Sequence, residues 1–138
     1  MPRFLRRAAC LSILLALAAT PALAQRSGAY RVAGTNLDGT SYEGVVLLQQ
    51  VGIVSFTLLW RVGGTEIRGV GMVSGHNFAV TYGSTERPGL GIYELQPDGT
   101  MVGSWTLVGA NQIGTETLTP PPEAPPAPAA ARPPAPRP

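Results

Sequence analysis

The chain has 138 residues, with ten arginines and no lysine, eight acidic residues and a single cysteine, and its formal net charge is +2. Three of the arginines, Arg3, Arg6 and Arg7, lie in a leader that we expect to be removed, which leaves seven arginines against eight acids and a net charge of −1. This balance excludes the broad basic surface that nucleic-acid binding needs. Cys10 lies in the same leader, so the remaining chain has no cysteine for a disulfide, a metal or a nucleophile.

The first 24 residues have the three parts of a secretory signal peptide. A basic segment (1–7) precedes an apolar run (8–19) and the small-residue sequence Ala22-Leu23-Ala24. The apolar run is too short to span a bilayer comfortably. We therefore expect residues 1–24 to be a signal peptide that is cleaved after Ala24. The mature protein would have no membrane span and would be periplasmic or secreted.

A proline-rich segment lies at the other end of the sequence. Residues 120–138 contain ten prolines and six alanines among nineteen residues. Such a composition can neither donate the hydrogen bonds of a sheet nor bury a core. It predicts a disordered Pro/Ala-rich tail, which would be either a solvated spacer or an arm that reaches a wall or a partner. Residues 25–119 would then form one domain.

Short strand-like segments separated by turn residues fill residues 25–119. No window keeps an uninterrupted helical period of about 3.6 residues, so helices are not expected. Eight segments have the composition of strands: 29–34, 40–50, 53–62, 65–74, 78–83, 90–96, 100–109 and 113–120. Short strands with short connections are typical of an antiparallel meander.

Three turns share one pattern, in "DGTSYEG" (38–44), "GGTEIRG" (63–69) and "DGTMVG" (98–103). Asp-Gly and Gly-Gly pairs supply the positive φ that two-residue hairpins need. A phosphate-binding loop would instead need glycines that lead into a helix. We therefore assign the glycines to the fold. Four lie within strands, where we expect bends or bulges: Gly44, Gly69, Gly71 and Gly103.

Side-chain alternation indicates which face of each strand is buried. In 53–62, one parity is apolar and should point inward, and its residues are Val54, Phe56, Leu58, Trp60 and Val62. In 65–74 the two parities are mixed, so no face is assigned. Eight such strands can close into a small all-β barrel whose interior is filled by side chains or holds one small ligand.

The residues that could carry chemistry are few. His76 is the only histidine, and a lone imidazole without cysteines does not build a typical zinc site, so no metal or other cofactor is expected. A serine hydrolase would need His76 as its base, but no serine has the sequence context of a nucleophile. Asp38 and Asp98 are expected to stabilise turns; a carboxylate pair like that of glycosidases is the alternative. No catalytic residue is assigned, and the protein is not expected to be an enzyme.

Six side chains are candidates to line a ligand cavity or its mouth: Tyr30, Trp60, His76, Tyr82, Tyr93 and Trp105. Packing in the core is the alternative for the aromatic residues. The sequence thus favours a non-enzymatic binding protein for an unknown protein or a small apolar ligand. The alternative is an envelope structural protein or adhesin that uses the tail as a spacer.

The strings "GTNLDGTSYEG" and "GLGIYELQPDGTMVGSWTLVGANQIGTETLTP" resemble a family of small exported proteins of Gram-negative bacteria, some of which are labelled fibronectin-binding protein. The resemblance covers residues 29–120 and implies an exported β-protein. Members often have cysteines in the middle strands, where this chain has none. The resemblance implies no site residues. The outline is also similar to the avidin and lipocalin barrels, in architecture only.

Overall fold

The computed structural model describes residues 26–122, so the expected signal peptide and nearly all of the expected tail lie outside the described residues. Eight strands and no helix are present in this range: β1 (Gly28–Thr35), β2 (Ser41–Gln50), β3 (Ser55–Val62), β4 (Thr65–Ser74), β5 (Asn77–Tyr82), β6 (Gly89–Leu95), β7 (Met101–Leu107) and β8 (Gly114–Thr119). Consequently, no helix among residues 26–122 is long and apolar enough to cross a membrane. The prediction of eight strands is confirmed.

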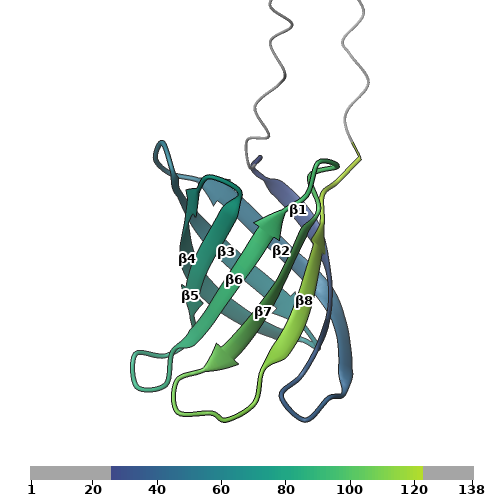
Figure 1. Cartoon of the computed structure of the whole chain (residues 1–138), viewed down its shortest axis with the longest axis vertical. Helices are drawn as coiled ribbons and strands as arrows, with labels where there is room; N and C mark the ends of the chain where they lie inside the picture. The colour runs from purple at the N-terminus through teal and green to yellow at the C-terminus, as the bar shows by residue number, and fades with distance from the viewer. Residues whose placement is uncertain (1–25, 123–138) are drawn as a thin grey trace, which may run out of the picture.

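The eight strands form a closed antiparallel barrel (Figure 1). Each strand pairs with its neighbours in the sequence, and β1 pairs with β8 to complete the ring. Closure leaves no unpaired strand edge, which is the feature that makes open sheets prone to associate. The expected all-β meander that closes into a barrel is therefore confirmed.

The two ends of the barrel differ in which loops they carry. The connections 36–40, 63–64, 83–88 and 108–113 lie at one end, which we call the mouth end. The connections 51–54, 75–76 and 96–100 lie at the other, together with the start of β1 and the end of β8, and we call it the terminal end (Figure 1).

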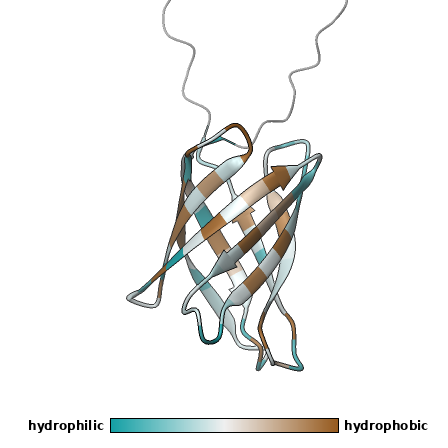
Figure 2. Cartoon of the chain, turned by 90° about the vertical axis from the view of Figure 1, so that its left-hand side faces the viewer, coloured by the Kyte–Doolittle hydropathy of each residue, from teal (hydrophilic) through white to brown (hydrophobic). Residues whose placement is uncertain are grey.

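Hydrophobic residues alternate with more polar ones along the strands (Figure 2). The inward positions form one core, with these buried residues: Tyr30, Val32, Val46, Leu48, Phe56, Leu58, Trp60, Phe78, Val80, Tyr93, Leu95, Met101 and Leu118. Phe56 and Phe78 meet edge to face, with ring centroids 5.5 Å apart. On β4, where the sequence assigned no face, Ile67 and Val73 pack against the core.

Two details of the strand prediction are wrong. Residues 53 and 54 belong to the loop before β3, where the Val51 amide donates to the Ser55 carbonyl, and Val54 is 46% exposed.

The Asp-Gly turns are also not two-residue hairpins. Asp38 does not have a positive φ, whereas Gly39 does, and the loop is closed by a hydrogen bond from the Asn36 amide to the Thr40 carbonyl. Within residues 26–122, only the Gly63–Gly64 turn has positive φ at two successive residues.

The expected bulges at the mid-strand glycines are absent. The six strand pairs that contain Gly44, Gly69, Gly71 or Gly103 all keep a continuous register through them. These inward positions instead lie close to side chains of neighbouring strands. A Cβ at Gly71, for example, would lie 2.8 Å from the Phe78 ring. At Gly69, Gly71 and Gly103 glycine therefore makes room for an aromatic ring inside a narrow barrel, and at Gly44 it makes room for Val62.

Candidate functional site

A pocket of about 260 Å³ lies inside the barrel toward its mouth end. Ten residues line it: Asn36, Tyr42, Trp60, Val62, Ile67, Tyr82, Tyr93, Trp105, Leu107 and Glu116. Trp60, Tyr93 and Glu116 are buried, and the other seven are half-buried. The pocket is therefore accessible from the mouth, whereas the core fills the barrel toward the terminal end.

Glu116 is the polar centre of the pocket. It is only 5% exposed, and both oxygens of its carboxylate accept hydrogen bonds. The Tyr42 hydroxyl donates to Oε2 at 2.6 Å. The Tyr93 hydroxyl and the Trp60 indole N–H donate to Oε1 at 2.8 Å and 3.1 Å. A carboxylate can only accept hydrogen bonds, and all three of its neighbours are donors, so the group is well matched to its surroundings.

The register of four strand pairs builds this arrangement. Glu116 lies opposite Gly34 of β1 on one side and opposite Gly103 of β7 on the other. Beyond these glycines, Tyr42 of β2 pairs with Gly34, and Tyr93 of β6 pairs with Gly103. We call this row of five inward positions, Tyr42–Gly34–Glu116–Gly103–Tyr93, the carboxylate row.

The two glycines allow the tyrosine rings to lie flat across the neighbouring strands. A Cβ at Gly34 would lie 2.6 Å from the Tyr42 ring and from its hydroxyl oxygen. A Cβ at Gly103 would lie 2.6 Å from the Tyr93 ring. Real Cβ atoms do not approach other atoms so closely. Any larger residue would therefore displace the rings that reach Glu116.

Burial and the Glu116 carboxylate both act on the tyrosines. Burial raises the pKa of Tyr93 well above its usual range, and the charge of Glu116 and its hydrogen bond raise it further. The pKa of Tyr42 is raised in the same way, first by burial and then by its hydrogen bond to Glu116. Burial raises the pKa of Tyr82 as well. The three phenols therefore stay protonated at physiological pH, and Tyr42 and Tyr93 remain hydrogen-bond donors.

Trp105 adds a second polar atom to the pocket. Its indole N–H is buried, and no hydrogen bond of good geometry satisfies it within residues 26–122. The indole still acts on the neighbouring Tyr42 hydroxyl, since it works to lower the pKa of Tyr42 against the larger effect of burial. The ring packs against β8, because Gly114 has no side chain to displace it. An unpaired buried donor is costly, so this N–H favours a ligand or a water that can accept a hydrogen bond.

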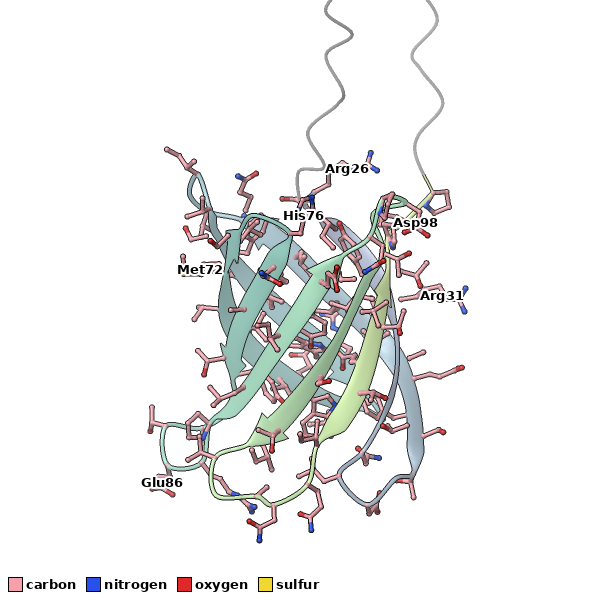
Figure 3. The ribbon with its side chains drawn as sticks, viewed as in Figure 1. Arg26, Arg31, Met72, His76, Glu86 and Asp98 are labelled. Atoms are coloured by element: carbon pink, nitrogen blue, oxygen red, sulfur yellow. The ribbon has the colours of Figure 1, made fainter. Side chains whose placement is uncertain are left out.

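The structure brings four of the six predicted site residues together. Trp60, Tyr82, Tyr93 and Trp105 line the pocket. Tyr30 and His76 do not line it. Tyr30 is buried in the core, where its hydroxyl donates to the Arg26 carbonyl. His76 is exposed in the 75–76 turn at the terminal end, as Figure 3 shows.

The most important residue of the pocket, Glu116, is absent from the residues singled out in the sequence. A signal for it exists, because Glu116 has the same parity as Gly114 and Leu118, whereas the threonines at 115, 117 and 119 have the other. A charged residue on the inward parity of a barrel strand indicates a buried polar site. Its partners, however, could not be recognised without the register of the closed barrel.

The two aspartates considered for a carboxylate pair lie at opposite ends of the barrel, in the loops 36–40 and 96–100. Oδ1 of Asp38 accepts hydrogen bonds from the Thr40 amide and hydroxyl, and Oδ1 of Asp98 accepts one from the Thr100 amide. Their expected role in turns is confirmed. Within residues 26–122, no three His, Cys, Asp or Glu side chains are grouped as metal ligands would be.

These features define an eight-stranded antiparallel β-barrel with an interior pocket at one end. Among solved structures, the chain is similar to a redesigned beta barrel, with a TM-score of 0.56 and 19% sequence identity, over 71% of this chain and 93% of that one. At this identity the likeness shows the fold alone. No family model matches the chain, and no curated protein matches it significantly.

Proposed function

We propose that this protein is an exported, non-enzymatic binding protein that takes one small ligand into the pocket at the mouth end of its barrel. The observation that carries this proposal is a pocket of about 260 Å³ with an aromatic and apolar lining around a single carboxylate. Ligand sites typically combine such a lining with a few polar groups. Because a cavity of about 150 Å³ can hold benzene, the pocket suits a ligand of about ten non-hydrogen atoms.

The composition of the pocket supports binding rather than catalysis. Its lining contains no serine, histidine or lysine, so it offers no serine–histidine pair and no reactive amine. The raised pKa of Tyr42 and Tyr93 disfavours a phenolate nucleophile. Both oxygens of Glu116 are already engaged by protein donors. Export is supported by the signal-like residues 1–24 and by the resemblance to a family of exported proteins.

Native mass spectrometry of the protein purified from the envelope of its own cells tests the proposal. An Ile67→Trp variant would fill the pocket, and Val70→Trp is the matched control, because Val70 lies on the same strand but is 55% exposed on the outside. We expect a reproducible added mass in the wild type and in the control, and its loss in Ile67→Trp. An added mass that persists in Ile67→Trp, or its absence from the wild type, would contradict binding in the pocket.

A second candidate function, contact with another protein, is favoured by the outside of the barrel. Val70 and Met72 of β4 and Leu90 and Ile92 of β6 are all about half exposed. The register places them in two rows that cross β5: Val70 and Leu90 flank Thr81, and Met72 and Ile92 flank Ala79. An exposed apolar surface of this kind often marks a protein contact. It fits the alternative of an envelope structural protein or adhesin. Loss of envelope association on deletion of residues 120–138 would support that alternative, and unchanged fractionation would contradict it.

A further inference from the structure

Glu116 gives the pocket a negative charge that its lining does not balance. Glu116 is the only charged side chain among the ten lining residues, and none of the ten is basic. The three groups that donate to it are two phenols and an indole. Because these donors are neutral, they hold the carboxylate in place without cancelling its charge. A buried charge without an opposite charge is costly, and a cationic ligand would supply the missing charge.

The aromatic lining of the pocket also favours a cation. The rings of Tyr42, Trp105, Tyr82 and Trp60 contact one another in that order, with centroids 5.3–6.4 Å apart and interplanar angles between 52° and 69°. None of these pairs is stacked face to face. The face of an aromatic ring is negative, and several rings around one space are the arrangement in which proteins bind ammonium groups.

The remaining features distinguish an organic cation from a metal ion. A calcium or magnesium ion needs about six oxygen ligands, whereas the lining offers such oxygens mainly from Glu116 and Asn36. The loops of the mouth end add Asp38, Glu86 and Arg87, which gives them a net charge of −1. Figure 3 shows Glu86 at this end. A mouth whose loops carry a net negative charge weakly attracts cations.

The buried N–H of Trp105 supplies a second anchor in the same pocket, because it acts on the Tyr42 hydroxyl without a hydrogen bond of good geometry. It can donate only to an acceptor, so the cation should also carry a neutral oxygen. We infer that the pocket binds a small alkyl or quaternary ammonium compound that carries a hydroxyl or carbonyl group. This inference rests on the proposed function, since it names the class of ligand that the same pocket takes.

Titration calorimetry with two probes of nearly equal shape tests the inference. Choline carries a trimethylammonium group and a hydroxyl, and 3,3-dimethylbutan-1-ol replaces the charged nitrogen by carbon. We expect choline to bind at least about tenfold more tightly, because only choline gains the attraction of the rings and the carboxylate. Equal affinity, or tighter binding of the neutral alcohol, would overturn the inference.

Two variants of Tyr82 separate the effect of its ring from that of its volume. The hydrogen bonds to the Glu116 carboxylate come from Tyr42, Trp60 and Tyr93. Tyr82 can therefore be changed without removing one of these donors. Tyr82→Leu should weaken choline binding about fivefold, whereas Tyr82→Phe should leave it unchanged, because phenylalanine keeps the ring. An equal loss in both variants would contradict a role for the ring face.

The two probes also keep the two proposals distinguishable. Binding of the neutral alcohol alone, abolished by Ile67→Trp, would overturn the cation inference and support a pocket for small apolar ligands. If neither probe binds and the protein from its own cells carries no added mass, both proposals fail.

Discussion

The hydroxyl of Tyr93, on β6, donates a hydrogen bond of 2.8 Å to Oε1 of Glu116, on β8, across Gly103 of the strand between them. The side chain of Tyr93 therefore spans a whole strand to reach the carboxylate. It can do so only because residue 103 has no side chain, and Tyr42 does the same across Gly34 on the other side.

Gly103→Ala should therefore be costly. The added methyl would contact the Ile92 carbonyl and the Tyr93 ring, so we expect the free energy of unfolding to fall by about 2–3 kcal/mol. Urea unfolding followed by tryptophan fluorescence measures this change. Ser104→Ala, at the adjacent exposed position of β7, is the control and should change stability by less than about 0.5 kcal/mol. Equal stability of the two variants would contradict the need for glycine.

Glu116→Gln should destabilise the barrel even though it removes a charge. The amide group of glutamine places donors where Tyr42, Tyr93 and Trp60 already donate, so at least one of these donors loses its partner. We expect a loss of about 3 kcal/mol in the free energy of unfolding. Glu94→Gln, at an exposed position of β6, is the matched control. A Glu116→Gln variant as stable as this control would show that the network contributes little.

Alkaline pH should unfold the protein through its buried phenols. Because the pKa of Tyr93 is raised in the folded state, mainly by burial, its contribution is complete below about pH 10 and is lost as the pH rises above that value. Above about pH 10, this one residue should lower the free energy of unfolding by about 1.4 kcal/mol per pH unit.

The alkaline prediction is checked by urea unfolding at a series of pH values up to 11.5, ~1.5 units above the ordinary tyrosine pKa. Tyr93→Phe should be less stable than the wild type at pH 7, yet its stability should fall less steeply above about pH 10. An unchanged slope in this variant would contradict the raised pKa.

The turn aspartates should respond differently to the loss of their threonine hydroxyls. The pKa of Asp38 is lowered first by the hydroxyl of Thr40, whereas the pKa of Asp98 is lowered first by the amide of Thr100. Thr40→Val should therefore raise the pKa of Asp38 more than Thr100→Val raises that of Asp98. NMR titration of the carboxyl carbons measures both.

The same lowered pKa values have a consequence for acid stability. Each aspartate stabilises the folded state above its unfolded pKa, and this contribution is lost as the pH falls through the lower folded pKa. Asp38→Asn and Asp98→Asn should each reduce the loss of stability on acidification. An unchanged acid dependence in both would show that these turns do not contribute.

The strands could be predicted because their signals are local. Turn residues such as Asp38-Gly39 and Gly63-Gly64 mark where strands end, and the alternation around Phe56 and Trp60 shows which face is buried. The predicted start of β3 at residue 53 is wrong because Ile53 is apolar like a strand residue, yet it lies in a loop and is 96% exposed.

The pocket was less predictable because its contacts depend on the register of the closed barrel. Tyr42, Trp60 and Tyr93 are 74, 56 and 23 residues from Glu116 in the sequence. The alternation of side chains along a strand shows which residues point inward, but it does not show which end of the barrel each of them lies near. Tyr30 and Tyr93 both point inward, but only Tyr93 reaches the pocket, because its position along its strand aligns with Glu116.

The start of β1 and the end of β8 both lie at the terminal end, and Pro121 approaches Gly28 there. A label, a solid support or a second protein joined before β1 or after β8 would therefore be attached at the terminal end of the barrel. The pocket would still face the solution. The barrel can thus be attached to a surface by this end without any change to the loops around its opening.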